Sequence, residues 1–388
     1  MAAPCEPKTS FQRRGKSKNF SVRGTRPSLH NGQLLVSTGV PSLDHLLGGG
    51  LAVGSVLLIE EDTFGSYANL LLRYFLAEGV MCGHGLMVAS AEEQPKKILK
   101  ALPHPVDDDK DRKTSQETDE DKMKIAWRYQ HLPQHQVSES AHQFGHGYDL
   151  NRVMGEPRLS SVNTTCFHLQ SQNIPLQDNS TNPAYLRLFS AVEKEITDGG
   201  YSLTADAAKS QGLTNRNVLR LGIYSLASPL WEENSDEHSS VSLCRFLHAL
   251  RGLLRVSLAV CVLTIPTHLY QDESRVRRIE RLCDAAFKLE SFAGSEKETN
   301  PAYKEYHGLF HIHRLPRLNT LASYLPDSMD LAFKLRRKKL TIEKLHLPPD
   351  LSETVSRSQE DPAKKAARSA SASAFNCASS LAERKLDF

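Results

Sequence analysis

The chain has 388 residues, and its 48 lysines and arginines against 45 aspartates and glutamates give a net charge of +3. With 39% hydrophobic residues and a mean hydropathy of −0.41, it is slightly polar for one compact domain, so part of it is expected to lie outside the core. No run approaches the ~18 apolar residues of a membrane span, and no secretory signal is expected. The seven scattered cysteines argue against a disulfide scaffold and a structural zinc site.

The N-terminal segment, residues 1–29, is basic. Over residues 1–27, seven lysines and arginines stand against the single acid Glu6, a net charge of +6. This composition predicts a disordered, solvated arm. A mitochondrial presequence is disfavoured because no amphipathic leucine-bearing helix is present. Contact of this arm with RNA stays open as an alternative.

Residues 30–347 are predicted to form a single α/β domain that carries two insertions. An acidic inserted loop is expected over 104–124, because 107–121 holds eight acids, three bases and no hydrophobic residue. A polar, irregular insertion is expected over about 148–183, which is rich in Asn, Ser, Thr and Gln. The Ser/Ala/Lys-rich residues 348–388 are expected to be a disordered tail.

The first folded block reads as strand, loop, helix and strand. The apolar run VLLI at 56–59 is typical of a strand buried on both faces. Apolar residues of 68–79 share one helical face, and the helix is predicted to end at Gly79. A second strand is predicted over 85–89, and Pro95 begins another helix. This order indicates a βαβ unit in a mostly parallel sheet.

The loop after the first strand lies where nucleotide-binding proteins carry the P-loop, G-x4-G-K-[ST]. Its backbone N–H groups wrap the phosphates, its lysine meets the β/γ-phosphates and its hydroxyl binds Mg²⁺. Aligned with this pattern, the chain keeps only the second glycine. The aligned loop is Glu60, Glu61, Asp62, Thr63, Phe64, Gly65, Ser66 and Tyr67.

Ser66 replaces the P-loop lysine and Tyr67 replaces the hydroxyl residue. Three carboxylates facing a polyphosphate would each cost about 1 kcal/mol or more. The helix N-terminus returns only about 0.3–1 kcal/mol. The loop is therefore expected to have the shape of an ATP site without its chemistry.

The run STGVPSLDHLLGGGLAVGSVLLIEEDTFGSY at 37–67 resembles the opening of RecA-like ATPases of the KaiC type. The resemblance implies a RecA-like fold, a mostly parallel twisted sheet flanked by helices. It also implies that Glu92 and Glu93 occupy the catalytic-glutamate position. Without a lysine or a Mg²⁺ ligand they are expected to cap the next helix instead. No catalytic residue and no cofactor is predicted, although ATP stays possible in an assembled ring.

The second folded block is expected to complete the sheet. Strands are predicted over 218–226, 258–265 and 283–289, with an amphipathic helix over 243–254 and an edge strand over 308–313. In RecA-like ATPases the strand corresponding to 218–226 ends in a Mg²⁺-holding aspartate. Here Tyr224 and Ser225 follow the apolar run, so no such acid is present.

Two basic clusters lie in this block. Four arginines within seven residues suit contacts with RNA phosphates, and the alternative is a solvated helix face. They are Arg275, Arg277, Arg278 and Arg281. A second cluster is interpreted as lysine and arginine protection of an edge strand. It consists of Arg336, Arg337, Lys338 and Lys339.

Four histidines have the spacing H-x3-H-x6-H-x3-H. They are His131, His135, His142 and His146. Pro133 interrupts the first pair, and the glycines at 145 and 147 interrupt the second, so no metal site is predicted.

A narrower resemblance covers most of 30–358 and is weakest over about 150–215. The segments AWRYQHLPQ, HQFGHGYDL, SPLW, RGLLRVSLAVCVLTIPTHL, ETNPAYKEYHGLFHIHRLPRLNTL and LHLPPDLSETVSRS carry it. Together they are similar to the fourth-subunit family of the Elongator complex.

This resemblance implies a non-catalytic subunit. It implies a heterohexameric ring with the fifth and sixth Elongator subunits, two copies of each, working with the catalytic Elongator subcomplex. The ring is expected to bind tRNA, and the arginine cluster is the candidate contact. It is expected to support modification of the wobble uridine U34 to 5-methoxycarbonylmethyl- and 5-carbamoylmethyl-uridine, in cytoplasm and nucleus. The alternatives are a ring ATPase that regulates tRNA release and an assembly scaffold without RNA contact.

Overall fold

The computed structural model describes residues 22–28, 32–106, 144–169, 182–203, 216–231, 237–317 and 325–346. Those up to Leu345 belong to one compact unit. Within them, no helix has the length and apolarity needed to cross a bilayer. Most of the basic arm and of the acidic loop lies outside the described residues, as do His131, His135, His142 and the C-terminal tail.

The core of the unit is a nine-stranded sheet with the order β14-β13-β12-β11-β4-β10-β9-β5-β8. From β11 to β8 neighbouring strands are parallel, and from β11 to β14 they are antiparallel. The parallel strands are β4 Val56–Glu60, β5 Gly85–Ser90, β8 Thr164–His168, β9 Leu219–Tyr224, β10 Ala259–Ile265 and β11 Ala285–Ser291. The predicted RecA-like α/β class, with a mostly parallel sheet, is confirmed.

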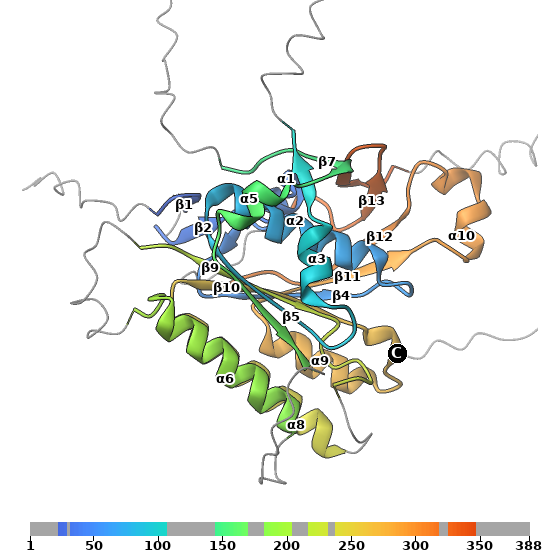
Figure 1. Ribbon diagram of the computed structural model, residues 1–388. Helices are drawn as coiled ribbons and strands as arrows, with labels where there is room; N and C mark the ends of the chain where they lie inside the picture. The colour runs from blue at the N-terminus through green and yellow to red at the C-terminus, as the bar shows by residue number, and fades with distance from the viewer. Residues whose placement is uncertain are drawn as a thin grey trace, which may run out of the picture. The chain divides into compact units, whose positions relative to one another are not determined.

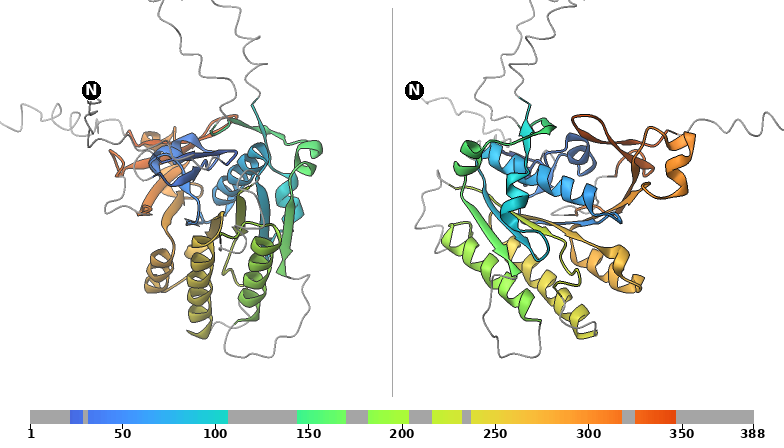
Figure 2. Two further views of the ribbon diagram at one scale, coloured as in Figure 1. Left: turned by 90° about the vertical axis from the view of Figure 1, so that its left-hand side faces the viewer. Right: turned by 45° about the vertical axis from the view of Figure 1, so that its right-hand side comes forward.

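Helices cover both faces of the sheet (Figure 1). On one face lie α1 Pro41–Leu46, α2 Ser66–Cys82 and α3 Pro95–Lys100, and on the other lie α6 Pro183–Asp198, α8 Glu237–Arg255 and α9 Glu273–Leu282. Figure 2 shows α6, α8 and α9, coloured green to orange, side by side below the strands. Along β4, Leu57 and Ile59 enter one core and Val56 and Leu58 the other, as the period of two in a strand requires.

The βαβ unit has the predicted order, but its helix is longer than expected. The helix α2 runs past Gly79 and ends at Cys82, and the capping residue Gly83 adopts a left-handed φ of 70°. Gly79 serves packing instead, because a Cβ there would lie 2.6 Å from Leu86 Cδ2 and 2.8 Å from Arg220 Cδ. The predicted end at Gly79 is wrong for that reason.

The antiparallel end of the sheet consists of β12 Gly308–Arg314, β13 Leu331–Leu335 and β14 Leu340–Lys344. The prediction that 308–313 is an edge strand is wrong, because β12 pairs with β11 and β13. The basic cluster at 336–339 is not a strand either. It forms the connection between β13 and the edge strand β14, closed by a hydrogen bond from the Arg336 amide to the Lys339 carbonyl.

The stretch expected to be irregular, about 148–183, contains regular elements. They are β7 Tyr148–Val153, which pairs with β6 Pro103–Pro105, α5 Glu156–Ser160 and β8. The strand β8 extends the main sheet beside β5. Its sequence TTCFH buries only Phe167 fully, so its pattern resembles a loop and the expectation is corrected for 148–168.

The N-terminal segment that precedes β4, residues 25–52, folds against the sheet. A small antiparallel sheet is formed by β1 Thr25–Pro27, β2 Leu34–Val36 and β3 Leu51–Ala52, so the end of the predicted arm is a strand. The Asp44 carboxylate holds the turn before α1, because it accepts 2.7 Å hydrogen bonds from the Thr38 amide and hydroxyl. The remaining short elements are η5 Thr267–Leu269, α10 Glu296–Thr299 and η6 Pro301–Tyr303.

Candidate functional site

The degenerate loop joins the central strand β4 to helix α2, as a P-loop does. Glu60 is the last residue of β4, and Gly65 precedes the first helical residue, Ser66. Gly65 has a φ of 64°, a left-handed conformation that costs other residues about 1–2 kcal/mol. The strand ends of β5, β9 and β10 lie at the same edge, which is where ligands bind in open α/β sheets.

Asp62 fills the place in which a P-loop would cradle a phosphate. One of its carboxylate oxygens accepts hydrogen bonds from the amides of Tyr67 (3.1 Å) and Ala68 (3.2 Å). The other accepts from the amide (3.3 Å) and hydroxyl (3.4 Å) of Ser66. These amides are the free donors of a helix N-terminus, the groups that bind anions in other proteins. The loop's own carboxylate therefore occupies the anion site.

Glu60 points into the protein rather than toward a ligand. Its side chain is 1% exposed, and it accepts a 2.9 Å hydrogen bond from the Thr267 hydroxyl. His313 Nδ1 lies 3.1 Å from Glu60 Oε1 and 2.6 Å from Glu280 Oε1. Burial would raise the pKa of Glu60, but contact with His313 lowers it, and the same contact raises the pKa of His313. The trio is explained as an ion pair between β4, β12 and α9.

The Glu61 carboxylate has fewer stabilising contacts than that of Glu60. Its Oε1 accepts a 2.6 Å hydrogen bond from the Thr264 hydroxyl, and its side chain is 6% exposed. Burial, with repulsion from Glu92 and Asp62, raises the pKa of Glu61 to about 7. The sequence predicted that all three acids of the loop face a polyphosphate. The structure corrects this, because each carboxylate has a different partner and only Glu61 lines the hollow beside the loop.

Glu92 and Glu93 lie at the end of β5, but they do not cap α3 as expected. The N-cap residue of α3 is Gln94, which makes no side-chain capping bond. Glu93 contacts Arg73 at 3.7 Å and Lys97 at 3.4 Å, while Glu92 lines the same hollow as Glu61.

The residues present do not fit a Mg-nucleotide. No lysine or arginine is among the described residues that line the hollow, whose volume is about 330 Å³. Tyr224 ends β9 and Ser225 follows it, and the Ser225 amide donates to the Thr264 hydroxyl at 2.8 Å. With Asp62 on the helix amides, a bound phosphate would meet carboxylates where a P-loop supplies a lysine and N–H donors.

The arginine cluster lies on α9, and the structure brings three of its four members together. Arg277, Arg278 and Arg281 line an open surface hollow of about 350 Å³. Arg277 pairs with Glu273 at 3.1 Å, and both side chains are exposed. Arg275 lies apart, half-buried, with its guanidinium 4.2 Å from the centre of the Tyr270 ring.

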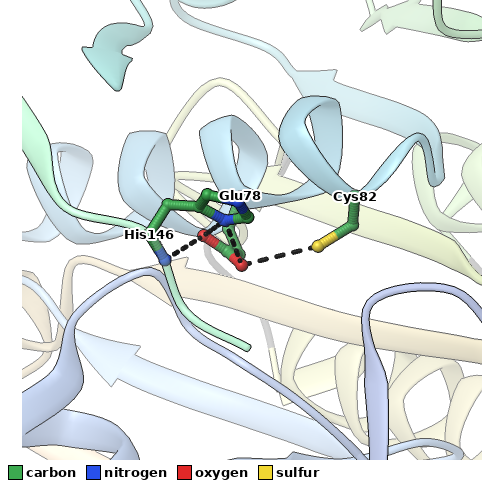
Figure 3. A group of neighbouring side chains, drawn as sticks. All are labelled: Glu78, Cys82 and His146. Carbon is green, nitrogen blue, oxygen red and sulfur yellow. Dashed lines mark hydrogen bonds and ion pairs between the residues drawn. The ribbon is translucent and has the colours of Figure 1, made fainter. Parts of the chain in front are cut away.

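Figure 3 shows a group of potential metal ligands, Glu78 and Cys82 on α2 with His146. Glu78 accepts hydrogen bonds from the His146 amide (3.0 Å) and the Tyr148 hydroxyl (2.6 Å). Burial raises the pKa of Cys82 to about 12, so the thiol stays protonated. The carboxylate is occupied and the thiol is neutral, so hydrogen bonding explains the group.

Sequence reasoning missed the charged partner of this group, Arg220. It is fully buried on β9, donates to His84 Nδ1 at 3.0 Å and to the carbonyls of Ser37 and Phe75, and lies within electrostatic reach of Glu78. The available signal was a single arginine in an apolar strand run and a single glutamate in an apolar helix.

The fold and the loop of residues 60–67 define the class of protein. It is a RecA-like protein in which the Asp62 carboxylate binds the helix amides that would otherwise bind a phosphate. A family model described as PAXNEB protein matches residues 18–386. Elongator complex protein 4 of Homo sapiens is 49% identical over 380 residues, which cover 91% of this chain and 88% of the relative. The protein of that name from Danio rerio is 49% identical over 363 residues, which cover 90% of each chain. The one from Saccharomyces cerevisiae is 22% identical over 398 residues, which cover 87% of this chain and 78% of the relative. This chain belongs to the Elongator complex protein 4 family.

Proposed function

We propose that the chain is a non-catalytic subunit of the Elongator complex. In this proposal it joins the fifth and sixth subunits, two copies of each, in a RecA-like heterohexameric ring. The observation that carries the non-catalytic assignment is the contact of Asp62 with the amides of Ser66, Tyr67 and Ala68. A subunit that fills its own phosphate site keeps the fold and its surfaces for assembly.

The ring is further proposed to bind tRNA and to support modification of the wobble uridine U34 by the catalytic Elongator subcomplex, in cytoplasm and nucleus. Family membership supports this, and so does the grouping of Arg277, Arg278 and Arg281 around one surface hollow. Arginine guanidinium groups suit phosphate oxygens in geometry and in charge.

The tRNA contact is tested in the assembled ring by replacing Arg277, Arg278 and Arg281 with alanine. If each contacts one phosphate, the slope of log K against log salt falls by about 2–3, and affinity falls at low salt. Replacing Arg336, Arg337 and Lys339 with alanine removes the same charge from the β13–β14 connection and serves as the matched control. Equal behaviour of the two triple variants would contradict the role of α9 and favour a scaffold without RNA contact.

The non-catalytic assignment is tested by ATP turnover of the ring. Gly65→Leu obstructs the loop, and Gly294→Leu imposes a comparable left-handed strain where a side chain meets open space. The proposal expects equal turnover in the two rings. A loss confined to Gly65→Leu would show that this loop serves hydrolysis.

A further inference from the structure

The hollow beside the degenerate loop has an acidic lining. The carboxylates of Glu61 and Glu92 line it, together with His268 and the hydroxyl-bearing residues Tyr224 and Ser225. Among the described residues, neither lysine nor arginine lines this space of about 330 Å³. The volume is at the lower end of ligand pockets, which hold about 300–1,000 Å³.

Its rim is apolar and open to solvent. Phe64 is 67% exposed, Leu230 is 51% exposed and Leu269 is 53% exposed, and all three line the hollow. Phe64 and Leu230 come from the loops after β4 and β9, and Leu269 ends the 3-10 helix η5 that follows β10. They are three of the nine large hydrophobic residues that are exposed in the described part of the chain. Exposed apolar side chains that lie together are typical of sites where a protein binds a partner or a ligand.

The sign of the charge decides between classes of occupant. A nucleotide or an RNA phosphate would meet Glu61, Glu92 and the adjacent Asp62 without a lysine or arginine from the described lining. A cation would reduce the repulsion between these carboxylates, and that repulsion is one reason the pKa of Glu61 is raised to about 7.

The apolar rim further selects the kind of cation. Lysine and arginine carry a charged group at the end of an aliphatic stem, which fits a passage between Phe64, Leu230 and Leu269. An arginine can also place its guanidinium against the Phe64 ring. A small hydrated ion gains nothing from such a rim.

We propose that this hollow is a socket for an arginine or lysine side chain of a neighbouring protein subunit, with Glu61 and Glu92 binding the charge and Phe64, Leu230 and Leu269 packing around the stem. The inference rests on the proposed function, because the neighbour is the adjacent subunit of the ring. It assigns the edge of the sheet that binds nucleotide in active relatives of this fold to subunit recognition.

The test is a titration of the full chain with the fifth and sixth subunits, read by fluorescence anisotropy and native mass measurement. Glu61→Gln keeps the side-chain size and an acceptor for Thr264, and Glu92→Gln and Phe64→Ala change surface groups. Each is expected to raise the dissociation constant about tenfold or more. Glu296→Gln, which neutralises an exposed carboxylate on α10, is the matched control and is expected to leave it unchanged.

A photo-crosslinker attached to Phe64→Cys then locates the occupant. Crosslinks to a partner segment that carries an arginine or lysine support the socket. Wild-type affinity in Glu61→Gln, Glu92→Gln and Phe64→Ala would overturn the socket but leave ring membership intact. A wild-type chain that fails to join the two subunits would overturn the proposed function, and the socket with it. Circular dichroism confirms that each variant is folded.

Discussion

Two buried glutamates, Glu78 and Glu61, show how differently one side chain is used in this fold. Burial alone would raise the pKa of both. At Glu78, hydrogen bonds from His146 and the charge of Arg220 overcome burial and lower the pKa to about 2. At Glu61, neighbouring acids add to burial and the pKa rises to about 7. Burial alone therefore does not decide whether the pKa of a carboxylate is raised or lowered. The charges and hydrogen-bond donors around the carboxylate decide it.

The largest expected effect comes from Glu78. Glu78→Ala leaves Arg220 buried without a counter-charge, and it removes the acceptor of His146 and Tyr148. A loss of about 3–5 kcal/mol in the free energy of unfolding is expected, measured by urea denaturation. Glu296→Ala, at an exposed position, should cost less than about 0.5 kcal/mol. A loss below about 1 kcal/mol for Glu78→Ala would contradict the view that Glu78 is the stabilising carboxylate of the two.

The second effect depends on pH and concerns Glu61. Because its folded pKa of about 7 exceeds its unfolded value, its contribution to stability is complete below pH about 4.5 and is lost as pH rises through 7. Glu61→Gln should remove that loss. The variant is expected to gain about 2–3 kcal/mol relative to wild type between pH 4.5 and 7.5, measured by denaturation at each pH. If the stability of wild type and of Glu61→Gln changed with pH in the same way, the pKa of Glu61 would not be raised by folding.

The smallest effect tests the loop's self-occupied anion site. Asp62→Ala removes the acceptor of the α2 amides and should cost about 1 kcal/mol, within the range of helix N-cap replacements. Asp62→Asn keeps an acceptor oxygen and should retain most of that stability. Calorimetry of the two variants compares them. Equal losses would mean that charge, rather than the hydrogen bonds, holds the helix start.

The parallel strands of the core could be predicted from the sequence because a strand buried on both faces consists of an uninterrupted apolar run, such as VLLI at 56–59. The edge strand β8 was not, because a strand with one neighbour needs few apolar residues and Phe167 alone is fully buried there. The end of α2 was misplaced for a related reason. Glycine at 79 is typical of a helix end, yet it is required by close contacts with Leu86 on the next strand and with Arg220, which lies far along the chain.

The loop shows the same division. From the sequence alone it followed that residues 60–67 lack the lysine and hydroxyl of a P-loop, since that depends only on residue types at fixed spacing. Where Glu60 and Glu61 point was decided by the tertiary structure, because their partners come from distant segments, whereas Asp62 contacts amides of its own loop. Thr267 and His313 hold Glu60, Thr264 holds Glu61, and the start of α2 holds Asp62. Spacing along a chain specifies which groups are available, but only packing between distant elements specifies which charges meet.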